Sequence, residues 1–157
     1  DAQVLQKKPD TLDCRVDRGG PVKVSFFSMP ALGQVAAPVV ADDINLNVAA
    51  LIDLAGAKAA VVQKRAEAKD YLDMDAMIGS GRVDLPVALA AGQVIYGRGF
   101  NPQSTLKALS YFQDGNLDQL PTDVCDRLAA AVRAVDLGAL PALNATRSRT
   151  DPGGASP

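Results

Sequence analysis

The residues most able to do chemistry lie between positions 58 and 73, where the sequence reads KAAVVQKRAEAKDYLD. If this segment formed one uninterrupted helix at about 100° per residue, Arg65 and Lys69 would each lie within about 20° of Lys58. Asp73 would then lie about 60° from Lys58. Lys58 also falls within an apolar run, where an ammonium group needs a partner or a ligand. The pattern therefore suggests a site for the phosphates of a nucleotide.

The same spacing has a simpler interpretation. Arg65, Lys69 and Asp73 at positions i, i+4 and i+8 are also typical of a solvated helix face, where each ion pair contributes a few tenths of a kcal/mol. Spacing alone leaves both interpretations open.

The composition of the chain excludes several kinds of catalytic and metal site. The chain has no histidine, which excludes a Ser-His-Asp triad, a Cys-His dyad and most zinc enzymes. Cys14 and Cys125 are far apart and lack a Cys-x-x-Cys partner, so we expect two buried thiols. Sixteen basic and eighteen acidic residues give a net charge of -2, so phosphate binding would have to come from a local cluster.

The amino-terminal part of the sequence predicts strands. Residues 11–16 and 22–27 alternate apolar and polar positions around the glycines of a tight turn at 17–20, which predicts a β-hairpin. Proline and glycine then break the chain, so we expect a loop with at most a short strand at 34–36.

The rest of the chain predicts helices, because apolar residues recur at helical spacing and few residues break the pattern. The expected helices cover residues 48–62, 69–78, 84–96, 101–111 and 122–135. Their expected caps are Asp53, Asp84, Asn101 and Thr122. Glycines at 79–81 and 97–99 should end the second and third helices. Residues 145–157 are too polar to offset their ordering entropy, which predicts a disordered tail.

Four aromatic residues have two alternative roles. They can anchor the core or serve as platforms on which nucleobases stack, and we favour the core. These residues are Phe26, Phe27, Tyr111 and Phe112.

The 55–73 segment resembles the lysine-arginine-aspartate signature of the AbiEii/AbiGii nucleotidyltransferase toxins of abortive-infection and type IV toxin–antitoxin systems. The strand at 20–27 and the helix at 106–112, with Asp114 and Gly115 after it, are similar to bacterial members of that family. The resemblance covers residues 3–143. It implies an α+β fold, in which a β-hairpin from a polymerase-β-like nucleotidyltransferase sheet precedes a helical domain.

The resemblance also implies a function and an organisation. Residues 1–47 would be the last strands and loop of the nucleotidyltransferase core, and residues 48–144 the helical domain. The protein would use Mg²⁺ to transfer a nucleotide from a nucleoside triphosphate to an RNA acceptor, which is the end of a tRNA in some members of the family. A cognate antitoxin is a further partner that the resemblance suggests. We expect a cytoplasmic chain with no membrane partner.

Five residues acquire roles from the same resemblance. Lys58 would contact the triphosphate, and Asp73 would be the downstream acid of catalysis. Arg65 and Lys69 match accessory basic positions that bind the nucleotide, with Asp70 beside them.

The chain departs from the family in one important respect. The metal-binding signature, a Gly-Ser turn followed by Asp-x-Asp, is missing, so we expect those carboxylates upstream of Asp1 and no activity from this chain alone. Asp13 and Asp17 are candidate stand-ins, although carboxylates beside a turn are usually turn residues. The alternative hypothesis is therefore a non-catalytic helical module that binds RNA or an antitoxin.

Overall fold

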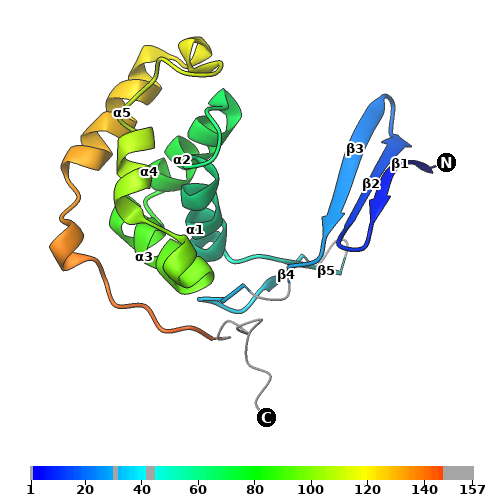
Figure 1. Cartoon of the computed structure of the whole chain (residues 1–157), viewed down its shortest axis with the longest axis horizontal. Helices are drawn as coiled ribbons and strands as arrows, with labels where there is room; N and C mark the ends of the chain where they lie inside the picture. The colour runs from blue at the N-terminus through cyan, green and yellow to red at the C-terminus, as the bar shows by residue number, and fades with distance from the viewer. Residues whose placement is uncertain (1, 30–31, 42–44, 147–157) are drawn as a thin grey trace. The chain divides into compact units, whose positions relative to one another are not determined.

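A computed structural model describes residues 2–29, 32–41 and 45–146 of the chain (Figure 1). These residues form two compact units. The first, which we call the sheet unit, contains residues 2–29, and the second, the helical unit, contains residues 32–41 and 45–146. Antiparallel strands followed by five α-helices confirm the predicted α+β class. Most of the predicted tail, from residue 147 onward, lies outside the described residues.

The sheet unit is a three-stranded antiparallel sheet in the order β1-β2-β3. Its strands are β1 (Ala2–Lys8), β2 (Thr11–Asp17) and β3 (Pro21–Phe27). The predicted hairpin is confirmed as β2 and β3, and Asp17 closes its turn by accepting hydrogen bonds from the amides of Gly19 and Gly20 at 3.1 and 3.0 Å. Strand β1 was not predicted. It pairs with β2 and contains an irregularity between Val4 and Gln6.

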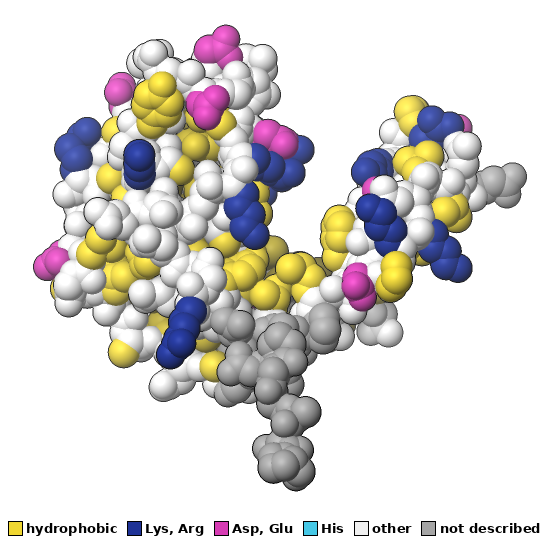
Figure 2. Space-filling model, viewed as in Figure 1, with side chains coloured by type: hydrophobic (Ala, Val, Ile, Leu, Met, Phe, Trp, Pro, Cys, Tyr) yellow, Lys and Arg dark blue, Asp and Glu magenta, His cyan; other side chains and the backbone are white. Residues whose placement is uncertain are grey.

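One face of this sheet is apolar. The strand register places Val4, Cys14 and Val24 in one cross-strand row, and Leu12 opposite Phe26. Figure 2 shows hydrophobic side chains at the surface of this unit. Phe26 and Phe27 are 57% and 65% exposed, so the prediction that they anchor a core is wrong. Cys14 is only partly buried, contrary to expectation.

The helical unit begins with a short antiparallel pair, β4 (Val39–Ala41) and β5 (Leu46–Val48), which we did not predict. Five α-helices follow, joined by short 3₁₀ turns. The helices are α1 (Leu51–Val61), α2 (Ala68–Gly79), α3 (Leu85–Tyr96), α4 (Pro102–Ala108) and α5 (Thr122–Arg133). The 3₁₀ turns are η1 (Gly97–Gly99), η2 (Leu117–Gln119) and η3 (Leu137–Ala139). Helix α1 begins later than predicted because residues 46–48 pair as a strand, and α4 ends three residues earlier than predicted.

Two of the four predicted caps are confirmed. Asp84 accepts a hydrogen bond from the amide of Val87 at 2.8 Å, and Asn101 accepts one from the amide of Gln103 at 3.0 Å. The other two are wrong, because the residues that precede α1 and α5 are Ala50 and Pro121. As predicted, glycine ends α3, where Gly97 takes a φ of +55°.

Asp53 has a different role from the one predicted. It lies within the first turn of α1, and its two carboxylate oxygens accept hydrogen bonds from the amides of Val35 and Ala36 at 2.8 and 2.9 Å. The side chain thus holds the 32–38 segment against α1.

The core of the helical unit is built around the close approach of α1 and α3. A Cβ added at Gly56 would lie 2.8 Å from the Cβ of Ala91, and one added at Gly92 would lie 2.6 Å from the ring of Phe100. Fully buried side chains from all five helices complete this core, among them Ala59, Met74, Leu89, Thr105 and Leu128. Cys125 is partly buried, not fully buried as predicted. Among the described residues no helix has the length and apolar character required to cross a bilayer.

Candidate functional site

The segment that carries the predicted site is not one helix. Helix α1 ends at Val61 and α2 begins at Ala68, although the sequence between them contains no proline or glycine. Contacts with distant residues fix the connection. The side-chain amide of Gln63 donates to the hydroxyl of Thr105 at 2.7 Å, and the amide of Ala68 donates to the side chain of Asn116 at 2.8 Å. The single helical stripe of three cations, which required one uninterrupted helix, therefore does not form, whereas the two separate helices expected at 48–62 and 69–78 are confirmed with shifted ends.

The break nevertheless brings four of the five predicted site residues together. The ammonium of Lys58 lies 2.8 Å from Oδ1 of Asp70 and 2.7 Å from Oδ2 of Asp73. The guanidinium of Arg65 donates through Nε to the other oxygen of Asp70 at 2.7 Å, and its Nη2 lies 3.3 Å from Oδ1. We call these four residues the Asp70 cluster. Lys58 comes from α1, Arg65 from the connection, and the two aspartates from α2.

Burial differs sharply among the members of the Asp70 cluster. The Asp70 side chain is inaccessible to solvent, that of Lys58 is 22% exposed, and those of Arg65 and Asp73 are about half exposed, at 46% and 55%. The buried carboxylate thus lies beneath a lysine whose ammonium group is partly accessible to solvent.

Hydrogen bonds keep Asp70 and Lys58 ionised. Burial alone would raise the pKa of Asp70, but the hydrogen bonds from Arg65 and Lys58 outweigh it and lower that pKa below its usual value. Burial likewise opposes the charge on Lys58, and its hydrogen bonds to Asp70 and Asp73 reverse the effect and raise its pKa. Both Asp70 and Lys58 are therefore charged at neutral pH.

Lys69, the fifth predicted residue, lies apart from these contacts. Its side chain is 66% exposed and pairs with Glu67 at 2.8 Å. Glu67 also lies 3.4 Å from Arg65, so it links Lys69 to the edge of the Asp70 cluster. The sequence offered no signal for Glu67, which precedes α2 and was not among the predicted site residues.

The Asp70 cluster can donate one hydrogen bond to a ligand, but its carboxylates are already occupied by cations. An ammonium group has three N–H donors, and Lys58 uses two on carboxylates, which leaves one for an oxygen of a ligand. Both oxygens of Asp70 already accept from cations, and in the part of the chain that the structure describes no three His, Cys, Asp or Glu side chains gather into a potential metal site. The described residues therefore do not fit a Mg²⁺ site.

The two candidate stand-ins for the missing carboxylates have other partners. Asp13 pairs with Lys23 at 2.9 Å across β2 and β3. Asp17 accepts two amide hydrogen bonds from its own turn. Both act as structural residues of the sheet unit.

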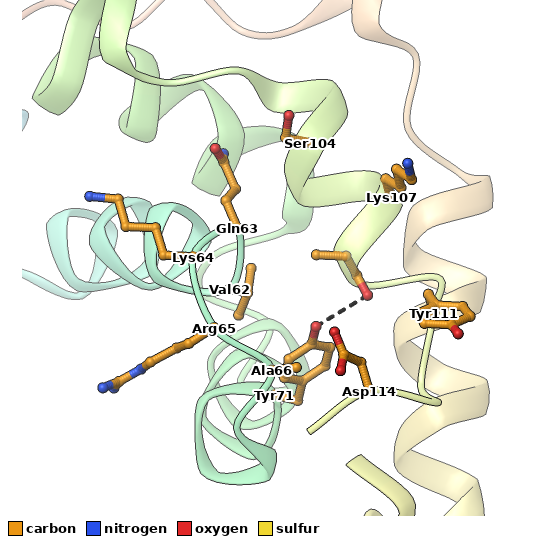
Figure 3. Close-up of a pocket in the computed structure, with 11 residues that line it drawn as sticks. Val62, Gln63, Lys64, Arg65, Ala66, Tyr71, Ser104, Lys107, Tyr111 and Asp114 are labelled. Carbon is orange, nitrogen blue, oxygen red and sulfur yellow. Dashed lines mark hydrogen bonds between the residues drawn. The ribbon is translucent and has the colours of Figure 1, made fainter. Parts of the chain in front are cut away.

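A pocket of about 350 Å³ lies beside the Asp70 cluster within the helical unit. We call it the Tyr71 pocket, after the buried tyrosine whose hydroxyl donates to the carbonyl of Ala108 at 3.2 Å (Figure 3). Arg65 belongs to both the pocket and the cluster. Lys64, Lys107 and Asp114 also line the pocket, and none of them was predicted as a site residue. No local sequence pattern could have grouped these three residues, because the 62–66 connection and α4 come together only in the folded chain.

Comparison with known proteins gave no match, whether to protein-family models, to curated proteins or to solved structures. The function must therefore be inferred from the residues and their geometry.

Proposed function

We propose that the chain is part of a nucleotidyltransferase that transfers a nucleotide from a nucleoside triphosphate to an RNA acceptor, such as a tRNA, in the cytoplasm. A toxin or phage-defence protein of the AbiEii/AbiGii type is the biological role that we propose with it. One observation carries the proposal. The Asp70 cluster joins Lys58, Arg65, Asp70 and Asp73, four of the five residues to which the resemblance to that family gives roles.

The chemistry of nucleotidyl transfer suits such a cluster. An acceptor hydroxyl oxygen bonds to the α-phosphorus, the bond to the pyrophosphate breaks, and the hydroxyl proton is released. Negative charge develops on the departing pyrophosphate, and an ammonium group held in a fixed position stabilises it. In the proposal, the remaining N–H of Lys58 contacts the triphosphate, while Asp70 and Asp73 position that lysine.

A ligand with several phosphates can contact both cations of the Asp70 cluster at once. Lys58 and Arg65 carry two positive charges, but Asp70 and Asp73 offset them. A lone phosphate would therefore gain little. A triphosphate can reach the partly exposed sides of both cations while Asp70 stays buried beneath them.

The binding of a nucleoside triphosphate to the 157-residue chain tests this proposal directly. Isothermal titration at low ionic strength should detect binding, because surface charge interactions are least screened there. Lys58→Gln should abolish it. Asp73→Asn should strengthen it severalfold, because one N–H of Lys58 becomes free and one repelling charge disappears. A lysine with a purely structural role would not produce the second effect.

Lys69→Gln is the matched control, because Lys69 is a nearby lysine paired with Glu67 and outside the Asp70 cluster. A smaller loss of affinity than in Lys58→Gln is expected. Thermal melting of each variant should establish that it is folded. The proposal would be contradicted if Lys58→Gln, once shown to be folded, bound the triphosphate as the unchanged chain does.

A second function is favoured by a specific observation. Asp70 is fully buried, and both its oxygens are satisfied by cations of the same chain, which is also what a structural ion-pair network looks like. On this alternative, the chain is a non-catalytic helical module that binds RNA or an antitoxin. RNA binding without any triphosphate binding would favour it.

A further inference from the structure

The Tyr71 pocket has two walls that come from different parts of the chain (Figure 3). The 62–66 connection forms one side, and α4 with the residues after it forms the other. In this view Lys64 extends outward from the first side and Lys107 extends outward from the second, in opposite directions, with Tyr111 beside Lys107. The Arg65 side chain extends away from the Tyr71 ring, in keeping with its bonds to Asp70. The pocket is thus distinct from the Asp70 cluster although they share one residue.

The two lysines of this pocket have no ion-pair partner among the described residues. Of the four lysines in the helical unit, Lys58 and Lys69 contact carboxylates. Lys64 and Lys107 are exposed and form no ion pair with any residue that the structure describes. Their charges are therefore available to an anion that approaches the pocket.

The pocket also offers an aromatic ring and an acceptor. Tyr111 is 57% exposed, so its prediction as a core residue is wrong, whereas Phe112 packs against the core and meets the ring of Tyr71 at 6.2 Å between centroids. Asp114 is exposed, and its Oδ1 accepts from the amide of Gly115 at 2.8 Å. Its other oxygen is available to the amino group of a base. An exposed aromatic ring beside unpaired cations is the combination that binds single-stranded nucleic acid.

We propose that the Tyr71 pocket binds one unpaired nucleotide of the RNA acceptor, with its base on Tyr111 beside Lys107 and the two phosphates that flank it directed toward Lys107 on one side and Lys64 on the other. The pocket volume of about 350 Å³ is near the lower end of the range for small-molecule sites, roughly 300–1,000 Å³, so it has room for one nucleotide unit and not for a duplex. The assignment to the acceptor rests on the proposed function. A free nucleotide also carries a base and a phosphate, so the experiment must distinguish it from the RNA acceptor.

Fluorescence anisotropy of the full chain with a 5′-labelled single-stranded RNA octamer tests this inference. Tyr111→Ala should weaken binding roughly 5- to 150-fold, since stacking on an aromatic side chain contributes about 1–3 kcal/mol per base. Tyr111→Phe should retain the affinity. Lys64→Gln and Lys107→Gln should each make the slope of log K against log salt shallower by about 0.7.

Arg82→Gln is the control for a general loss of charge, because Arg82 is exposed, outside the pocket lining and unpaired among the described residues. It should leave both affinity and slope unchanged. AMP tests whether the pocket prefers a free nucleotide, and a blunt RNA duplex of the same length tests whether it requires an unpaired base. The octamer should bind more tightly than either.

Three results would overturn the inference. The first is that the octamer does not bind. The second is that Tyr111→Ala and the two lysine variants bind it as tightly as the unchanged chain does. The third is that the duplex binds as tightly as the single strand. AMP binding as tight as the octamer would overturn the assignment to an acceptor. If the triphosphate still binds through Lys58 in any of these cases, this inference fails while the proposed function stands. Loss of triphosphate binding alone would leave the nucleotide pocket intact and remove its link to transfer.

Discussion

Replacing Asp70 by asparagine is the sharpest perturbation of the helical unit. The substitution keeps the shape of a side chain that is inaccessible to solvent and removes its charge. Three hydrogen bonds from cations end on the carboxylate, from Lys58 at 2.8 Å and from two nitrogens of Arg65 at 2.7 and 3.3 Å. An asparagine offers only one oxygen, so its amide N–H₂ would face a donor of Arg65 or Lys58.

The magnitude follows from these contacts. A hydrogen bond to a charged group contributes about 1.5–3 kcal/mol, and breaking a buried ion pair costs about 3–5 kcal/mol when a charge is left unpaired. Lys58 retains Asp73 and Arg65 retains Glu67, so neither cation is left alone. We therefore expect the free energy of unfolding to fall by about 2–4 kcal/mol, a large part of the roughly 5–15 kcal/mol of a typical domain.

Urea unfolding followed by circular dichroism at pH 7 measures this loss. Asp73→Asn is the matched control, because Asp73 contacts the same lysine at 2.7 Å but is 55% exposed, and exposed ion pairs contribute about 0–1 kcal/mol. The slope of free energy against urea should stay unchanged in both variants. Unfolding of Asp70→Asn at the same urea concentration as the unchanged chain, or an equal cost for both substitutions, would refute this reasoning.

Single contacts predict three further outcomes. Asp53→Asn should accelerate hydrogen exchange at the two loop amides that donate to its carboxylate, and equal protection in both proteins would contradict that role. Gly92→Ala should lower the free energy of unfolding, measured in urea, by about 1–3 kcal/mol, because its Cβ would lie 2.6 Å from the Phe100 ring. Gly79→Ala is the control and should be neutral or stabilising, because a Cβ there would meet nothing within 4 Å. The stability that Asp70 contributes should be present above the unfolded pKa of about 3.9 and lost as the pH falls through its lower folded pKa, so acid unfolding should be less steep in Asp70→Asn.

Local signals explain which elements the sequence could predict. Asp84 and Asn101 were identified as caps because a cap depends on a side chain and amides two or three residues away. The hairpin of β2 and β3 was predictable for the same reason, since Gly19 can take the φ of +79° that its turn requires. Strand β1 was missed although Pro9 and Asp10 form its turn to β2, because its residues do not alternate regularly and the pairing is irregular between Val4 and Gln6.

The candidate site depended on contacts that no local pattern records. The sequence predicted separate helices at 48–62 and 69–78, but not the contacts that fix their connection: Gln63 and Ala68 bond to Thr105 and Asn116, which are 42 and 48 residues away along the chain. One continuous helix would have placed Lys58 and Asp73 about 22 Å apart along its axis. Their contact at 2.7 Å arises from the packing of α1 against α2. Asp53 was mistaken for a cap because its partners lie in a loop 17 and 18 residues earlier.

The central claim is that Lys58 contacts the triphosphate of a nucleotide, and the NMR signal of its ammonium group tests this most directly. Lysine NH₃⁺ resonances can be observed when ion pairs slow their exchange, and Lys58→Arg identifies the one that belongs to Lys58. Addition of a nucleoside triphosphate to the full chain should shift that resonance while the Lys69 resonance changes less. A Lys58 resonance that stays unchanged at saturating triphosphate would contradict the claim.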